Sequence, residues 1–303
     1  MNIYLHIGYP KTATTFLQKK IFPCHPAIAD WNPRKPQYQW LESIIRQHDF
    51  AFDASAIRAR VEAMAAEEAA TTIVISREIL VGDAYGGGRD SRIIADRLHS
   101  VFPDAQIIIT LRNQLDMIDS LYRQYVCQGG GCRFEQFLNL SSKLIFFDLD
   151  YLFYARLICY YQALFGADAI LVCLYEVFKE SPQTFLDDLW IFMSVKPLEV
   201  PPSAFKSEVN KGMSCPSLWI ARFLNRITYS PDFHPDAIVP IPTNIHRQLL
   251  QRGLDPLLFH RFFGQKSFMT QTLRAELVDY YRESNRVLQT MVNVSLEEYG
   301  YPL

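Results

Sequence analysis

The fold is decided near the start of the chain, by the stretch NIYLHIGYPKTATTFLQKKI at residues 2–21. Residues 2–7 have the composition of a short buried strand. Residues 8–11 predict a turn, because glycine and proline favour turns, and residues 12–21 are compatible with a helix. A strand that passes through a tight turn into a helix is the repeating unit of α/β folds.

The same alternation continues along the first two thirds of the chain. Further strands are predicted at residues 71–76, 106–111 and 169–174. Helices are predicted at residues 54–70, 91–102, 115–126, 134–140 and 182–193. Strands that alternate with helices predict an α/β fold with a parallel β-sheet, flanked by helices on both faces.

The alternation is lost in the proline-bearing residues 196–205, and the remainder is mostly helical with long loops. We therefore expect one domain over residues 1–303. It would comprise an α/β core at residues 1–195 and a helical C-terminal part at residues 196–303.

Composition narrows the classes of function. Lysine plus arginine number 30 and aspartate plus glutamate 32, a net charge of −2, which lacks the basic excess of nucleic-acid binders. No signal peptide is expected, and charges at Asp148, Asp150 and Arg156 interrupt the most apolar stretch, so no membrane insertion is expected. The six cysteines and seven histidines show no zinc-ligand spacing. We expect a cytoplasmic protein with no bound metal.

The turn at residues 8–15 carries the groups that an anion site needs. A helix N-terminus offers N–H groups and a partial positive charge, Lys11 adds a full charge, and three threonines add hydroxyl donors. It is not a Walker A loop, because no glycine directly precedes the lysine. Taken alone, these residues fit either a phosphate or sulfate site or an ordinary helix start.

Residues 6–18, HIGYPKTATTFLQ, resemble the 5′-phosphosulfate loop of the sulfotransferase family, a strand–Gly-x-Pro-Lys-Thr-Gly-Thr-Thr–helix motif. Ala13 stands where glycine or serine is more usual, and alanine is small enough to let the backbone approach a phosphate. The resemblance implies that the parallel β-sheet is P-loop-like, that residues 1–195 are an α/β nucleotide-binding core, and that the core binds 3′-phosphoadenosine-5′-phosphosulfate (PAPS). Its 5′-phosphosulfate would be held by Pro10, Lys11, Thr12, Ala13, Thr14 and Thr15.

A second motif follows the strand at residues 106–111. Arg112 ends the strand, and Ser120 lies eight residues later, inside the next helix. Residues so placed hold the 3′-phosphate in the family, and Gln114 replaces the family's frequent proline. A forked guanidinium suits a phosphate because it forms charge-assisted hydrogen bonds. The resemblance therefore implies that Arg112 and Ser120 bind the 3′-phosphate.

Weaker matches lie further along the chain. Tyr175 ends a strand, as a tyrosine near the nucleoside does in the family, and residues 283–286 are similar to bacterial members. Lys211 and Gly212, preceded by Asn210 instead of arginine, resemble the loop that closes over the 3′-phosphate; a Lys-Gly pair is otherwise a common surface turn. The glycine triplets at residues 86–88 and 129–131 fit either a mobile acceptor gate or plain connectors.

The resemblance implies an in-line displacement catalysed by positioning and charge stabilisation. Lys11 would neutralise the bridging oxygen. Family members place a glutamate or histidine base after the strand at residues 71–76, which implies Glu78. A glutamate there could instead pair with Arg77 or cap the next helix.

The function that the sequence predicts is sulfuryl transfer from PAPS to a hydroxyl or amine, with 3′-phosphoadenosine-5′-phosphate (PAP) as product. The motif style resembles bacterial members active on glycans, which favours a carbohydrate or glycolipid acceptor; a small phenol or alcohol is the alternative. A P-loop nucleotide or sugar kinase would need Walker motifs that the sequence lacks. A non-catalytic PAP-binding module is a further alternative, although the residues of both motifs and Glu78 are retained.

Overall fold

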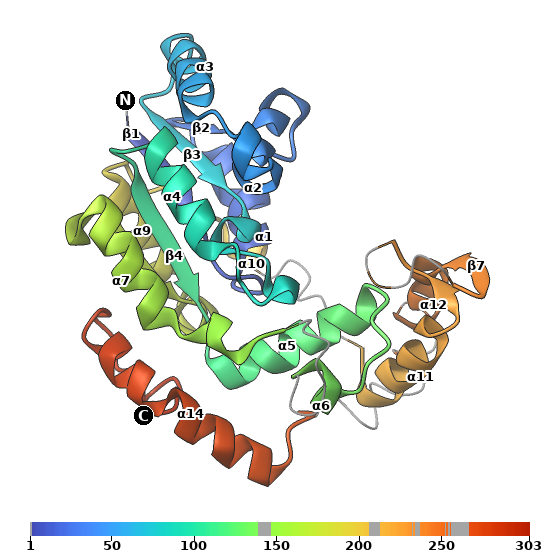
Figure 1. Ribbon diagram of the computed structural model, residues 1–303. Coiled ribbons are helices and arrows are strands. Elements are labelled where there is room, and N and C mark those ends of the chain that lie inside the picture. Colours follow the sequence, from blue (N-terminus) through green and yellow to red (C-terminus); the bar gives the residue numbers. More distant parts are fainter. Residues whose placement is uncertain are drawn as a thin grey trace. The chain divides into compact units, whose positions relative to one another are not determined.

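A five-stranded parallel sheet is formed by segments between residues 2 and 174, with the strand order β2-β3-β1-β4-β5 (Figure 1). The computed structural model describes residues 2–138, 147–205, 213–231, 233, 237–251, 253, 255 and 267–303. The strands are β1 (Asn2–His6), β2 (Ile28–Asp30), β3 (Thr72–Ser76), β4 (Gln106–Leu111) and β5 (Ile170–Leu174). The predicted parallel sheet is confirmed, and β2 is an additional strand that the sequence did not indicate.

The central strand β1 pairs with β3 on one side and β4 on the other. His6 is in register with Ser76 of β3 and Ile108 of β4. The three strands therefore end at one edge of the sheet, where parallel α/β proteins bind ligands. The segments after β1, β3 and β4, which carry the sequence motifs, begin at this edge.

Both faces of the sheet are covered. On one face, Tyr4, Val74 and Ile108 pack against η1 (Leu17–Ile21), a π-helix, and α9 (Pro182–Met193). On the other lie α4 (Ser91–Val101) and α7 (Tyr154–Phe165), in front of the sheet in Figure 1. Successive strand residues point to opposite faces of the sheet, so a strand that is covered on both faces is apolar throughout. This continuous apolar run is the pattern from which the strands were predicted.

The predicted helices differ from expectation mainly at their ends, and residues 139 and 140 of the helix expected at residues 134–140 lie outside the described residues. The helices α7 and α8 (Tyr175–Glu180) were not predicted. The helix expected at residues 12–21 is divided into α1 (Thr14–Phe16) and η1. No helix was expected at residues 36–42, which form η3 (Pro36–Glu42), a 3₁₀ helix that begins at a proline. The other helices of this half are η2 (Phe22–Cys24), α2 (Ser43–Arg46), η4 (Asp49–Ala51), α3 (Ala54–Ala66), η5 (Glu78–Val81), η6 (Ala84–Gly86), α5 (Gln114–Cys127), α6 (Phe134–Phe137) and η7 (Leu149–Leu152).

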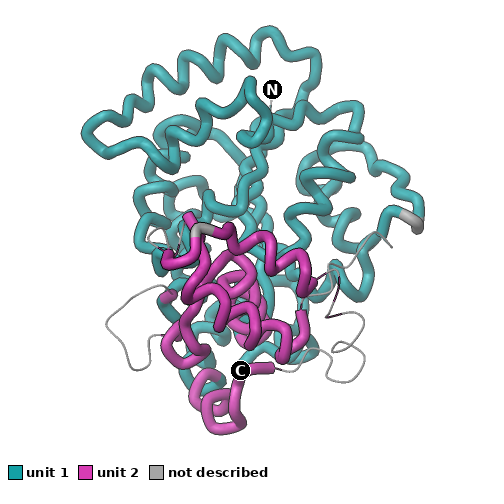
Figure 2. The backbone as a smooth tube through the Cα atoms, turned by 90° about the vertical axis from the view of Figure 1, so that its right-hand side faces the viewer, with its two compact units in different colours: residues 1–114, 148–205, 278–303 teal, residues 115–147, 206–277 magenta. Residues whose placement is uncertain are grey.

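The chain divides into two units, coloured separately in Figure 2. The first comprises residues 1–114, 148–205 and 278–303 and holds the sheet; the second comprises residues 115–147 and 206–277. The expected division at residue 195 stays a prediction. The later elements are η8 (Ala167–Ala169), α8 (Tyr175–Glu180), α10 (Pro202–Phe205), α11 (Cys215–Asn225), β6 (Thr228–Tyr229), β7 (Val239–Pro242), α12 (Thr243–Leu249) and α14 (Gln271–Gln289).

The last third of the chain is mainly helical, as expected, with a small parallel pair of strands, β6 and β7, in addition. Across the described ranges, none of the helices combines the length and the apolar character that crossing a membrane requires. The glycine triplets are closely packed: a Cβ on Gly88 would lie 2.3 Å from the Tyr151 ring, and one on Gly130 would lie 2.3 Å from the Tyr125 ring. The gate hypothesis for these triplets stays a prediction.

A buried amide pair joins α14 to the start of α5. Gln114 Nε2 donates to Asn285 Oδ1 at 2.6 Å, and Asn285 Nδ2 donates to Gln114 Oε1 at 3.2 Å and to the Pro302 carbonyl at 2.9 Å. Both amides are fully buried. The glutamine that stands in place of the family's frequent proline therefore holds the C-terminal segment of the first unit.

We expect Asn285→Ala to lower the free energy of unfolding by about 2 kcal/mol, because it leaves the buried Gln114 amide without its partner. Urea denaturation measures this change. Arg286→Ala, at the exposed neighbouring position, serves as the control and should change stability by less than about 0.5 kcal/mol. Equal effects of the two substitutions would contradict the prediction.

Candidate active site

The loop after β1 runs unusually close to β4. A Cβ on Gly8 would lie 1.8 Å from Thr110 Oγ1, so only glycine fits at this position. The N–H groups of Ile7 and Tyr9 donate to the carbonyls of Ile108 and Thr110, each at 3.0 Å. The loop is thereby held along the carboxyl end of β4.

Two residues of the loop have left-handed backbone conformations. Lys11 has φ 66° and Ala13 has φ 63°, and each costs about 1 kcal/mol in a residue other than glycine. Ala13 is the N-cap of α1, so the left-handed backbone, in addition to the need for a small residue, accounts for the glycine that is usual at this position of the motif. Strain of this kind is typical of ligand-binding loops.

A chain of hydrogen bonds lies beneath the loop. Thr12 Oγ1 donates to the Tyr9 carbonyl at 2.5 Å and lies 2.8 Å from Thr110 Oγ1. His6 Nε2 lies 3.4 Å from Thr110 Oγ1, and His6 Nδ1 lies 2.7 Å from Ser76 Oγ. Because each hydroxyl has one proton, Thr110 donates to Thr12, His6 Nε2–H donates to Thr110, and Ser76 donates to Nδ1. Thr12 therefore maintains the shape of the loop, whereas Lys11 and Thr15 are exposed.

Arg112 leaves the end of β4 and reaches the same loop. Its Nη1 donates to the Lys11 carbonyl at 3.4 Å, and its guanidinium lies 5.1 Å from the centre of the Tyr175 ring, a cation–π contact. Tyr154 Oη donates to the Arg112 carbonyl at 2.6 Å. The Nε of Arg112 is buried and has no acceptor among the described residues, so the group retains a donor that an anion would satisfy.

The residues around Arg112 are fixed from β5. Tyr175 begins α8 directly after this strand. The next residue, Glu176, accepts a hydrogen bond from the Asn113 backbone N–H at 3.0 Å and one from Tyr301 Oη at 3.2 Å. Burial raises the pKa of the Glu176 carboxyl. This carboxylate joins the ends of β4 and β5 and so supports both Arg112 and Tyr175.

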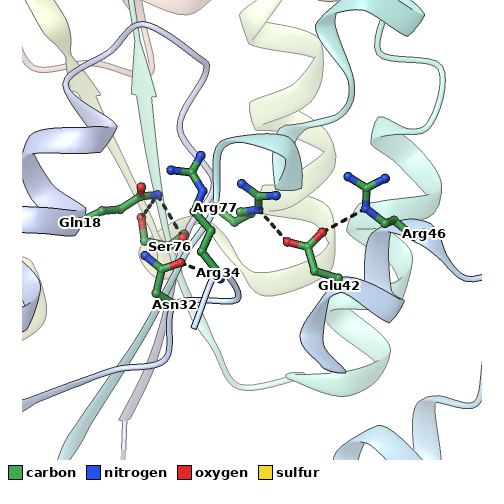
Figure 3. Close-up of polar contacts among 7 residues, drawn as sticks. All are labelled: Gln18, Asn32, Arg34, Glu42, Arg46, Ser76 and Arg77. Carbon is green, nitrogen blue, oxygen red and sulfur yellow. Dashed lines mark hydrogen bonds and ion pairs between the residues drawn. The ribbon is translucent and has the colours of Figure 1, made fainter. Parts of the chain in front are cut away.

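Glu78, the expected base, is the first residue of η5 and follows β3 after one residue. It is half-buried, and its carboxylate has no ion pair or hydrogen bond with any residue in the described ranges. Arg77 pairs instead with Glu42, at 2.8 Å between Nε and Oε1 (Figure 3). The structure therefore shows neither alternative role: Glu78 does not pair with Arg77, and its side chain does not cap η5.

The sequence predicts three further site residues. Ser120 lies half-buried in α5 and belongs to the second unit. Lys211 and Gly212 lie outside the described residues. Within the part of the chain that the structure describes, no three histidine, cysteine, aspartate or glutamate side chains gather as metal ligands would.

Sequence reasoning did not single out Thr110, Tyr154 or the hydrogen bonds of His6. The sequence contains an indication of a role for Thr110, because it is a polar residue inside the apolar run of residues 107–111. The sequence contains no such indication for Tyr154, since this residue lies in an aromatic-rich segment that is typical of a hydrophobic core.

Comparison with known proteins identifies the type of fold. No protein-family model matches the chain, and no curated protein matches its sequence. The chain is similar in structure to the sulfotransferase from Alicyclobacillus acidocaldarius, with a TM-score of 0.58 and 18% identity over 99% of this chain and 98% of that one. Mouse sulfotransferase SULT7A1 complexed with PAP matches with a TM-score of 0.47 and 14% identity, over 96% and 86% of the two chains. The protein has a sulfotransferase-type α/β fold.

The buried histidine predicts a pH-dependent stability. Burial lowers the pKa of His6 to about 3, from 6.5. Below pH 6.5 the unfolded chain binds a proton that the folded chain does not, so the free energy of unfolding falls as pH drops from 6.5 toward 3, by at most about 1.4 kcal/mol per unit. Urea denaturation between pH 7.5 and 4.5 should show a steeper decline for the wild type than for His6→Asn.

Thr110→Val keeps the histidine and removes one of its partners, so it should keep the steep decline while lowering stability throughout. Parallel curves for the wild type and His6→Asn would show that His6 is not the responsible group.

Proposed function

We propose that this protein is a PAPS-dependent sulfotransferase that transfers a sulfuryl group to an acceptor hydroxyl or amine and releases PAP. The observation that carries the proposal is the hydrogen bond between Arg112 Nη1 and the Lys11 carbonyl, at 3.4 Å. It joins two sequence motifs that, in the resemblance, contact opposite ends of one nucleotide. The sulfotransferase-type fold supports the same function.

The donor nucleotide would be bound by both motifs. Residues Pro10–Thr15 would hold the 5′-phosphosulfate through backbone N–H groups, Lys11 and Thr15. Arg112, with its unsatisfied Nε, would bind the 3′-phosphate together with Ser120, Lys211 and Gly212. Tyr175, already in contact with the Arg112 guanidinium, would lie near the nucleoside.

The transfer would be an in-line displacement. The acceptor oxygen or nitrogen forms a bond to sulfur as the bond from sulfur to the bridging phosphate oxygen breaks, which leaves PAP. Lys11 would neutralise the charge that grows on that oxygen. Glu78 would take the acceptor's proton; its carboxylate has no partner among the described residues that would compete for this role. The acceptor that we propose is a carbohydrate or glycolipid.

Calorimetric titration with PAP, AMP and ATP tests the assignment of the nucleotide. We expect PAP to bind more tightly than AMP, which lacks the 3′-phosphate, and Arg112→Ala to weaken PAP binding by about 10- to 100-fold, the loss of one charge-assisted contact. AMP binding should change little in this variant. Arg286→Ala, a surface arginine paired with Glu283, is the control. Tighter binding of ATP than of PAP would favour a kinase instead.

A second test concerns the base. We expect Glu78→Gln to lower the transfer rate by at least about 100-fold and to leave PAP affinity within twofold, because the substitution removes the proton acceptor but not a nucleotide contact. Transfer from a radiolabelled sulfate donor measures the rate. Glu62→Gln, at an exposed position of α3, is the matched control. An unchanged rate would exclude Glu78 as base, and a wild type that binds PAP without transfer would indicate a non-catalytic module.

A further inference from the structure

The peptide group that follows Arg112 is hydrogen-bonded at both of its polar ends. The carbonyl of Arg112 and the N–H of Asn113 belong to the same planar unit. Tyr154 Oη donates to this carbonyl at 2.6 Å, and Glu176 Oε1 accepts from this N–H at 3.0 Å. The two partners come from α7 and α8. We refer to these two hydrogen bonds as the peptide clamp.

Residues 299–301 support the peptide clamp through a second set of contacts. Tyr301 Oη donates to the other carboxylate oxygen of Glu176 at 3.2 Å. The side chain of Asn113 donates from Nδ2 to the Gly300 carbonyl at 2.6 Å and to the Tyr299 carbonyl at 3.3 Å. One short segment near residue 300 therefore holds both the residue that follows Arg112 and the carboxylate that binds its N–H group.

The donors of this arrangement are buried. Tyr154 is 0% exposed, Tyr301 4% and Asn113 6%. Burial raises the pKa of the Tyr154 and Tyr301 phenols well above the ordinary value, so both hydroxyls remain protonated and keep donating at neutral pH. A buried carbonyl or carboxylate that loses such a donor has no solvent to replace it. Removal of one hydroxyl therefore changes the orientation that the peptide group prefers.

The peptide clamp determines the direction in which the Arg112 side chain leaves the backbone. The preceding residue, Leu111, is in register with Leu174 of β5, so the sheet fixes the peptide group on one side of Arg112 and the clamp fixes the one on the other side. At the far end, the guanidinium contacts the Tyr175 ring and the Lys11 carbonyl. An arginine restrained at its base and at its tip loses less freedom when it binds an anion.

We propose that the peptide clamp sets the selectivity of the protein for a 3′-phosphate, and that Tyr154 and Tyr301 are positioning residues that act through Arg112. This inference rests on the proposed function, in which Arg112 binds that phosphate. Each tyrosine hydroxyl already donates to the clamp or to its carboxylate, so its effect on the nucleotide is indirect. Loss of either hydroxyl misaligns the guanidinium and leaves the groups of the Lys11 loop in place.

Calorimetric titration of two variants that each lack one hydroxyl tests the inference, because PAP and AMP differ only in the 3′-phosphate. We expect Tyr154→Phe and Tyr301→Phe each to weaken PAP binding by about 3- to 10-fold and to leave AMP affinity within twofold. Tyr154→Phe keeps the ring that packs against Tyr9, at 4.7 Å between ring centroids, and so preserves the loop. Tyr281→Phe is the matched control, since this buried hydroxyl also donates to a backbone carbonyl, that of Leu149, at 2.9 Å; both affinities should stay within twofold.

A double-substitution cycle identifies the residue through which the tyrosines act. In an Arg112→Ala background, Tyr154→Phe should weaken PAP binding by less than a further twofold, because no guanidinium remains to be positioned. A purely structural role would instead weaken PAP and AMP binding equally. Equal losses for the two nucleotides, unchanged PAP affinity in both tyrosine variants, or a full Tyr154→Phe effect in the Arg112→Ala background would each overturn the inference.

The same titrations distinguish this inference from the proposed function on which it rests. A wild type that prefers PAP to AMP, with the preference retained in Tyr154→Phe and Tyr301→Phe, rejects only the role of the peptide clamp. A wild type that binds PAP no more tightly than AMP rejects the proposed function itself.

Discussion

The close approach of the β1 loop to Thr110 is the contact on which the site depends. There is no space for a Cβ at Gly8, and the Thr110 hydroxyl contacts both Thr12 of the loop and His6 of β1. Thr110 lies two residues before Arg112, so the contact that shapes the loop also determines where the guanidinium begins. A wider separation of β1 and β4 would take Arg112 away from the Lys11 carbonyl.

The same contact accounts for two unfavourable features. His6 is kept neutral in the interior, and Lys11 and Ala13 have left-handed conformations. Both persist because the surrounding hydrogen bonds leave no better arrangement: releasing the loop would leave the buried hydroxyls of Thr12 and Thr110 unpaired. Backbone strain is thus maintained where the loop would meet an anion, and not elsewhere in the sheet.

The sequence predicted the parts of the molecule that depend on local patterns. The strands β1, β3, β4 and β5 are apolar because both faces of the sheet are covered, so their ends, and Lys11 and Arg112 with them, could be located. The strand β2 has only three residues, too few for a pattern, and η3 lies in a polar stretch. The Arg77–Glu42 pair joins residues far apart in the chain, and nothing local indicates which glutamate Arg77 meets. Glu78 was located by the strand that precedes it, and its lack of a described partner became visible only in the folded chain.

The strand order separates the two halves of the proposed reaction. Because β1 lies between β3 and β4, the Lys11 loop has the Arg112 motif on one side and Arg77 with Glu78 on the other. The β4 side is supported by Glu176 and Tyr154, and the β3 side by Glu42, Gln18 and the Asn32 turn. These two sets of supporting contacts share no residue. The two sides are linked by β1 and also by α7, in which Tyr154 donates to the Arg112 carbonyl and Tyr161 donates to the Leu80 carbonyl beyond β3.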